Sequence, residues 1–209
     1  MTEWNRVKKI LDSEQRPEAR FLDFAALLAR EAGIDPQNVV VVGGSAIQVY
    51  TESAYVSNDL DIVAVGHRAA IEDVLVNWGF EGTRGLRQWS RDGLDFTVDL
   101  FTIEYTGSKD LTRVVATRYG SVRVTAVEDL FLKRLDSVRS GSSTRGMDLD
   151  HAKLILDAYG DEFNWAYVDE VAKRQLTTEL VAMMRGMNAR SANDRAAKRI
   201  QQRVRSRAD

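Results

Sequence analysis

The fold of this chain is decided by Val39-Val-Val-Val-Gly-Gly-Ser45 and, thirteen residues further on, by Asp59-Leu-Asp-Ile-Val63. A continuous run of β-branched residues is typical of a strand that is buried on both faces. Gly43 and Gly44 then allow the backbone to turn sharply and to approach a bulky group closely. Ser45 leads into a short helix, and the free N–H groups at a helix N-terminus attract an anion such as a phosphate. An N-cap role for Ser45 uses the same geometry.

Two carboxylates follow on a strand predicted over 60–65, where Asp59 and Asp61 alternate with apolar residues. Alternation places both side chains on the same face of the strand. Neighbouring carboxylates repel each other unless a cation lies between them, and hard oxygen ligands suit Mg²⁺, with Mn²⁺ as the alternative ion. Surface acids on an edge strand are the plain alternative, but the preceding glycine turn favours a metal site.

A third carboxylate is available on the strand predicted over 94–101, in which apolar and polar residues alternate. Asp95 and Asp99 share its polar face but lie two pleats, roughly 13 Å, apart, so we do not expect both to reach the same metal pair. Three carboxylates can bridge two metal ions, one activating the attacking oxygen and one steadying the leaving phosphate. The residues alone leave the choice between Asp95 and Asp99 open.

The remaining patterns predict an α/β half followed by a helical half. In the first half we expect helices on both sides of Pro17, a glycine-bearing loop over 79–93 and a hairpin turning at Tyr119-Gly-Ser121. Further helices are predicted over 46–52, 69–78, 127–139, 148–159, 161–174, 176–187 and 192–206. The fold class is therefore α/β (α+β), with an α/β domain over 1–126 and a helical domain over 127–209.

Composition excludes several kinds of site. The 209 residues contain no cysteine, which rules out disulfides, thiolate zinc sites, iron–sulfur clusters and a cysteine nucleophile. The two histidines, His67 and His151, are far apart in sequence, so a histidine-rich metal site is not expected. We see no signal-peptide pattern and no apolar run long enough to span a membrane, and we expect a cytoplasmic protein.

The net charge of −2 conceals an asymmetry. Residues 185–209 hold eight basic and two acidic residues and carry +6, so the preceding 184 residues carry −8. This basic tail predicts contact with RNA or tRNA, while docking on the acidic body or on a neighbouring subunit is the alternative.

At Gly44-Ser45, Asp59, Asp61 and Asp99 the sequence resembles nucleotidyltransferases of the DNA polymerase beta superfamily. Their pattern is a Gly-Gly or Gly-Ser turn, a helix, an Asp-x-Asp strand and a later third Asp. Within that pattern Asp99 is preferred over Asp95, because Val98-Asp99-Leu100-Phe101 resembles the end of the third strand. The resemblance implies a nucleotidyltransferase fold with a small mixed β-sheet flanked by helices, followed here by a C-terminal helical bundle.

A second block resembles small stand-alone bacterial and archaeal members, including abortive-infection type toxins. In these proteins a helix begins with an acidic residue, carries a Lys about five residues on, and precedes an Arg-x-x-Asp element. Glu128, Lys133 and Arg145-Gly-Met-Asp148 match in that order, although the Arg145 element follows a longer Ser/Gly loop than expected. The resemblance covers roughly residues 38–157 and includes none of the further domains of true polymerases.

The resemblance implies transfer of a nucleoside monophosphate from an NTP to an acceptor hydroxyl. Asp59, Asp61 and Asp99 would hold two Mg²⁺ ions, and Asp99 would also take the hydroxyl proton. Gly43, Gly44, Ser45 and Lys133 would bind the phosphates, although Lys133 at the edge of an apolar stripe also fits a snorkelling lysine.

An RNA or tRNA 3′ end is the favoured acceptor and a protein hydroxyl the next, in an enzyme of toxin-like or defence type. The alternative is a non-catalytic nucleotide-binding or partner-binding protein of the same fold, such as one component of a toxin–antitoxin pair with a small protein partner. For Asp148 we favour a helix cap, and for His151, Trp89 and Tyr105 packing roles.

Overall fold

The computed structural model describes residues 3–64, 66–101, 104–141 and 144–187. Contacts divide the chain into two units, Met1–Leu130 and Phe131–Asp209. The division falls inside helix α5 (Val127–Arg139), whereas the sequence places the domain boundary just before that helix. Each unit has its own buried core and is described by itself.

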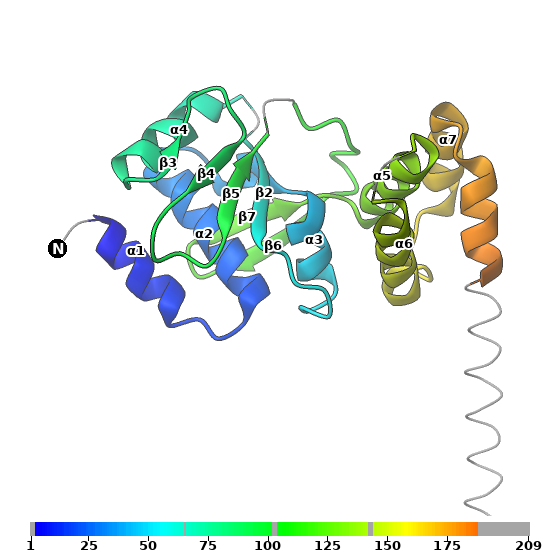
Figure 1. The fold of residues 1–209 in the computed structure, drawn as a ribbon, viewed down its shortest axis with the longest axis horizontal. Coiled ribbons are helices and arrows are strands. Elements are labelled where there is room, and N and C mark those ends of the chain that lie inside the picture. The colour runs from blue at the N-terminus through cyan, green and yellow to red at the C-terminus, as the bar shows by residue number, and fades with distance from the viewer. Residues whose placement is uncertain (1–2, 65, 102–103, 142–143, 188–209) are drawn as a thin grey trace, which may run out of the picture. The chain divides into compact units, whose positions relative to one another are not determined.

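The first unit is built on one mixed sheet (Figure 1). Among the described residues, seven strands lie in the order β3-β4-β5-β2-β1-β7-β6. They are β1 (Val39–Val41), β2 (Asp59–Ala64), β3 (Glu81–Gly82), β4 (Gln88–Ser90), β5 (Thr97–Leu100), β6 (Arg113–Thr117) and β7 (Gly120–Val124).

Two parallel pairings determine which residues meet inside this sheet. β1 is parallel to β7 and antiparallel to β2, and β2 is parallel to β5. Parallel strands need long crossover connections, and helix α4 lies in the segment that joins β2 to β5. The arrangement places β2 and β5 side by side in the interior of the sheet, which brings both predicted acidic strands together.

Helices pack on this sheet around a cluster of aromatic rings. They are α1 (Glu3–Asp12), α2 (Pro17–Glu31), the 3₁₀ turn η1 (Pro36–Asn38), α3 (Gly43–Tyr50) and α4 (Arg68–Asn77). Helix α2 contacts β1, β6 and β7, and its Phe24 meets Phe96 edge to face at 5.5 Å between ring centroids. Trp4 from α1 meets Phe80 in the same way at 5.4 Å. The helices predicted in this half are present, with different bounds for α3, and the mixed α/β class is confirmed.

The second unit is helical, as predicted. It contains most of α5, then α6 (Arg145–Tyr159), α7 (Trp165–Gln175) and a helical segment over 178–187. Phe131, Phe163 and Trp165 form its aromatic core, with Phe131 and Phe163 centroids 5.3 Å apart. The helix predicted over 192–206 lies outside the described residues.

In the second unit, α6 begins three residues before its predicted start and α7 four residues after it. Three predicted elements of the first unit also differ from the structure. The loop predicted over 79–93 contains β3 and β4, which are too short to give a periodic pattern. The strand predicted over 94–101 begins only at Thr97, since the chain preceding it turns away to an ion pair described below. Helix α3 begins at Gly43 rather than at residue 46.

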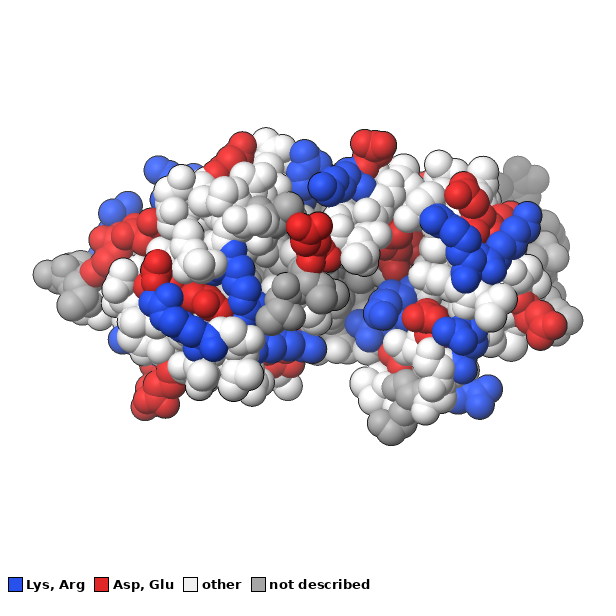
Figure 2. All heavy atoms as spheres, turned by 90° about the horizontal axis from the view of Figure 1, so that it is seen from above, with Lys and Arg blue, Asp and Glu red and all other residues white. Residues whose placement is uncertain are grey.

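Within the described parts of the chain, no helix combines the length and the apolar character needed to cross a membrane. On the face drawn in Figure 2, acidic and basic side chains are interspersed rather than gathered by sign. The basic residues from 188 onward, which make up nearly all of the predicted RNA-binding tail, lie outside the described residues.

Candidate active site

Asp61 and Asp99 are direct partners in the register of the parallel strands β2 and β5. Each side chain is almost completely buried, with 10% of the Asp61 side chain and 9% of the Asp99 side chain exposed. Two buried carboxylates in one place are unfavourable unless hydrogen bonds or a cation compensate their charge. The structure therefore brings together two of the three predicted metal ligands in a setting that requires a positive partner.

The glycine turn that begins α3 lies against Asp61. The Gly44 N–H donates a hydrogen bond to Asp61 Oδ2 at 2.8 Å. Gly43 has a φ of +58°, and a Cβ atom at this position would collide with the Asp61 carboxylate. The close approach predicted for these glycines is thus an approach to Asp61, and the first turn of α3 supplies positive dipole to it.

Ser45 is fully buried, and its hydroxyl joins the N-cap of α3 to strand β2. Its Oγ donates to the Val42 carbonyl at 2.9 Å and accepts from the Asp61 N–H at 3.0 Å. Val42 is the N-cap residue of α3, so the N-cap role considered for Ser45 is wrong, because the helix starts two residues earlier. The phosphate roles of Gly43, Gly44 and Ser45 stay predictions.

Burial raises the pKa of Asp61 to about 6. The Gly44 N–H and the Arg87 guanidinium lower it, while the neighbouring Asp99 carboxylate raises it further. The raised value follows from the placement of a charged group in the interior of the sheet next to another acid.

Arg87 supplies the positive partner, and the sequence did not reveal it. Its Nη2 lies 3.3 Å from Asp61 Oδ1 and 2.5 Å from Asp99 Oδ2. Its guanidinium stacks over the Phe101 ring at 4.1 Å from the centroid. Arg87 belongs to the segment predicted as a loop, and no pattern in that segment indicated that it returns to the edge of β5.

Asp59 occupies a different local environment. It is partly exposed and lies opposite Thr97, whose hydroxyl donates to Asp59 Oδ1. In the described ranges, no group of three acidic or histidine side chains is close enough to hold a metal ion. Asp59 as a third ligand stays a prediction.

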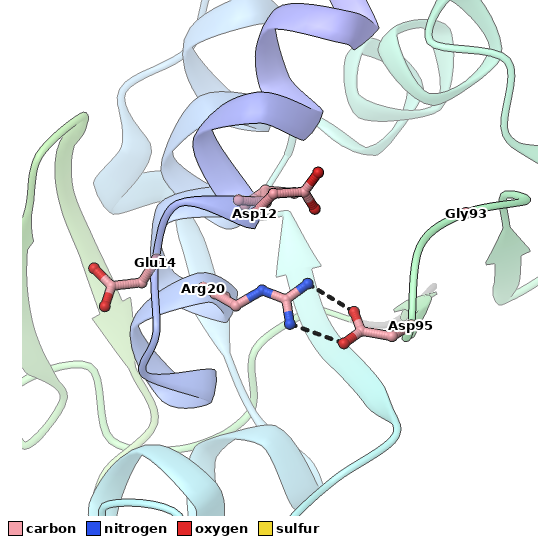
Figure 3. Close-up of a pocket in the computed structure, with 6 residues that line it drawn as sticks. Asp12, Glu14, Arg20, Gly93 and Asp95 are labelled. Carbon is pink, nitrogen blue, oxygen red and sulfur yellow. Dashed lines mark hydrogen bonds and ion pairs between the residues drawn. The ribbon is translucent and has the colours of Figure 1, made fainter.

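Asp95 lies away from this site. It forms a two-pronged ion pair with Arg20, at 2.8 and 2.7 Å, which lowers the pKa of Asp95 (Figure 3). Both residues line a cavity of 330 Å³ together with Asp12, Glu14 and others. Of the two acids that the sequence left open, Asp99 is the one that meets Asp61.

The second sequence block lies mainly in the helical unit. Lys133 is largely exposed, with its Nζ 3.9 Å from Asp136, and its predicted phosphate contact stays a prediction. Asp148 is in the first turn of α6, where it accepts a hydrogen bond from Thr144 Oγ1 at 2.9 Å and pairs with Arg134 at 3.2 Å. The capping role we favoured is wrong, because α6 begins at Arg145 and its N-cap is Thr144, but Asp148 is still an acid in the first turn of the helix.

The remaining candidates are packing residues. Trp89 is fully buried on β4, and His151 is buried in α6, where burial lowers the pKa of its imidazole. The Tyr105 hydroxyl donates to Asp129 Oδ2 at 3.1 Å, and burial raises its pKa to about 12.

The Asp61–Asp99 pair fits a divalent cation. The two carboxylates already share one positive group, and Asp99 Oδ1 is buried with no hydrogen-bond partner among the described residues. Buried oxygens without a donor are costly, and a hard cation such as Mg²⁺ would satisfy them. The donor set, two carboxylates without sulfur or imidazole, is the kind that Mg²⁺ and Mn²⁺ prefer.

No protein-family model and no curated protein matches this sequence. Among solved structures, the antibiotic-resistance factor ANT(2'')-Ia is 14% identical and superposes with a TM-score of 0.52, covering 80% of this chain and 96% of its own. An antigenic nucleotidyltransferase-like protein from Paracoccidioides brasiliensis is 18% identical over 65% of this chain and 75% of its own, with a TM-score of 0.45. The first of these likenesses shows the architecture, and the chain therefore has a nucleotidyltransferase fold.

Proposed function

We propose that this protein transfers a nucleoside monophosphate from an NTP to an acceptor hydroxyl in a Mg²⁺-dependent reaction. The observation that carries the proposal is the pairing of Asp61 with Asp99 on adjacent parallel strands, at the glycine turn that begins α3. A buried acid pair has no role in stabilising a sheet, because its desolvation is unfavourable. A nucleotidyltransferase fold gives the pair a chemical purpose.

Asp61 and Asp99 would hold the metal, and Asp59, two residues before Asp61, is the proposed third ligand. When bound, Mg²⁺ would stabilise charge on the phosphates and lower the pKa of the acceptor hydroxyl. Gly43, Gly44 and Ser45 at the start of α3 would bind the phosphates, and the Gly44 N–H, which donates to Asp61 in this structure, would have to leave that carboxylate to do so. Lys133 would neutralise the charge of the phosphates.

The bond changes of the proposed reaction balance without a further reagent. The acceptor oxygen forms a bond to the α-phosphorus, the bond from that phosphorus to the bridging oxygen breaks, and pyrophosphate leaves. Asp99 takes the proton of the acceptor hydroxyl. Positioning and charge neutralisation by these side chains would supply most of the rate acceleration.

The proposed acceptor is an RNA or tRNA 3′ end, with a protein hydroxyl next, in an enzyme of toxin-like or defence type. The support for RNA is the basic tail of the sequence. ANT(2'')-Ia is described as an antibiotic-resistance factor, which makes small hydroxyl compounds a necessary comparison in any test.

The direct test is incubation of the protein with each α-labelled NTP, Mg²⁺ and, in separate reactions, total RNA, lysate protein and small hydroxyl compounds. We expect wild-type protein to label one acceptor class, and Asp61→Asn and Asp99→Asn to lose at least about a hundredfold of that activity. Asp95→Asn is the matched control, since Asp95 pairs with Arg20 away from the site, and it should retain activity. Labelling that survives both site variants, or is absent from wild type in every reaction, would contradict the proposal. NTP binding without turnover would favour a non-catalytic nucleotide-binding protein.

A further inference from the structure

The Arg87 guanidinium bridges Asp61 and Asp99, the two carboxylates that would share a metal ion. A single nitrogen of Arg87 contacts one oxygen of each carboxylate, at 3.3 and 2.5 Å. A divalent cation that used the same two oxygens would meet this positive group at contact distance. Like charges that close repel strongly, so the guanidinium and the metal exclude each other.

The backbone that carries Arg87 is firmly attached to β5. The Leu100 N–H donates to the Arg87 carbonyl at 2.8 Å. Arg68 on α4 holds the same two segments together, donating to the Leu100 carbonyl at 2.6 Å and to the Leu86 carbonyl at 2.7 Å. Glu72 completes the clamp by pairing with Arg68 at 2.8 Å and accepting from the Gly85 N–H at 3.0 Å. The main chain at Arg87 is thereby kept beside the acid pair.

The Arg87 side chain has more freedom than its backbone. Half of it is exposed (52%), while the two carboxylates it contacts are buried. Its other contact is the face of Phe101, which supports a guanidinium without locking it into one hydrogen-bonding geometry. The guanidinium can therefore leave the carboxylates while remaining at the edge of the site.

A guanidinium released at this edge has a preferred partner in the proposed reaction. Arginine binds phosphate oxygens through two parallel N–H donors, and such charge-assisted pairs are among the stronger hydrogen bonds in proteins. The incoming NTP would bring phosphates to the same metal that displaces Arg87.

We propose that Arg87 is an exchangeable cation of this site: it neutralises Asp61 and Asp99 in the metal-free protein and turns to the phosphates of the nucleotide when a divalent ion replaces it. The contact between Arg87 and the nucleotide phosphates rests on the proposed function, whereas the exchange of Arg87 for a metal ion does not. It predicts opposite effects on two ligands from one substitution.

The first measurement is Mn²⁺ binding to nucleotide-free protein, followed by electron paramagnetic resonance of the free ion. Arg87→Ala removes the competing cation and should bind Mn²⁺ about tenfold more tightly than wild type. Arg87→Lys should lie between the two. Arg84→Ala is the matched control, because Arg84 belongs to the same segment but pairs with exposed Asp73, and its Mn²⁺ affinity should equal that of wild type.

The second measurement is binding of the four α,β-methylene NTP analogues at saturating Mg²⁺, followed by calorimetry. Arg87→Ala should weaken the best-bound analogue about tenfold, Arg87→Lys should restore part of the loss, and Arg84→Ala should change nothing. A merely structural role for Arg87 would weaken Mn²⁺ and nucleotide together, since both depend on the same acid pair.

The outcomes separate this inference from the proposed function. Unchanged or weaker Mn²⁺ binding by Arg87→Ala overturns the exchange, even if the wild-type protein proves to be a transferase. Tighter Mn²⁺ binding with unaltered analogue binding overturns the phosphate contact. The wild-type protein could label no acceptor while Arg87→Ala still binds Mn²⁺ more tightly and the analogue more weakly. That result would contradict the transferase function and support the exchangeable cation.

Discussion

Asp61 is an acidic residue at a buried position, where the charged form of its side chain is disfavoured. Burial raises its pKa from 3.8 to about 6, so between these values the folded protein binds more protons than the unfolded chain. Stability therefore falls as pH rises through this window, and the lower level persists above pH 6. A shift of this size corresponds to roughly 3 kcal/mol at neutral pH.

We therefore expect Asp61→Asn to stabilise the metal-free protein at pH 7.5, by roughly 1–3 kcal/mol, and to flatten the pH dependence between pH 4 and 6. Urea unfolding in a chelator over this pH range measures both effects. Asp95→Asn is the control and should have the opposite effect. The ion pair with Arg20 lowers the pKa of Asp95, so in wild-type protein the stabilisation from this pair is lost as pH falls, and the substitution removes it. A less stable Asp61→Asn protein at pH 7.5 would show that Arg87 and Gly44 compensate the buried charge in full.

At the residue scale, the sequence anticipated what depends on local pattern. Alternation along the two strands gave Asp59 with Asp61 and Asp95 with Asp99, the family resemblance preferred Asp99, and paired glycines indicated a close approach. Arg87 could not be found in this way. Its place beside both acids depends on the pairing of β4 with β5, a contact that leaves no periodic signal in so short a strand.

At the scale of elements, the Arg68–Glu72 clamp on α4 connects a helix to the segment that carries Arg87. Arg68→Met should cost about 3 kcal/mol of stability, because it leaves the nearly buried Glu72 carboxylate without its cation. Amide hydrogen exchange at residues 84–88 should accelerate beyond what the global loss explains, since those residues lose their hold on β5. Arg84→Met is the control. It breaks an exposed ion pair, so it should change stability by less than about 1 kcal/mol and leave the exchange rate of the Leu100 amide unaltered. Equal exchange rates of residues 84–88 and Leu100 in the two variants would refute the clamp.

The elements themselves were predictable where they are long or uniformly apolar. β1, β2 and the helices α1, α2 and α4 follow from runs and 3.6-residue periodicity, whereas β3 and β4 span too few residues. Strand β5 is shorter than its pattern because Asp95 leaves the sheet to meet Arg20, a partner 75 residues away that no local signal reveals.

At the scale of the whole molecule, charge is distributed unevenly along the chain. Residues 188–209 contain seven basic and two acidic residues. If this tail binds RNA, deletion of 188–209 should weaken RNA binding and reduce the slope of log affinity against log salt by several units, at about 0.7 per lost phosphate contact. Binding of the NTP analogues should be unaffected. Salt-titrated RNA binding by the full chain and the truncated chain provides the measurement, and equal slopes would exclude the tail as the RNA contact.

The aromatic cores of the two units give each its own optical signature. Of the four tryptophans, Trp4, Trp78 and Trp89 are buried in the first unit, and Trp165 is in the second, where the Arg185 guanidinium stacks on it at 3.9 Å. Indole emission in Trp165→Phe protein would arise from the first unit alone. A protein that keeps only Trp165 would report the second. Fluorescence can thus follow the two halves of this chain separately through denaturation or ligand binding, without any added dye.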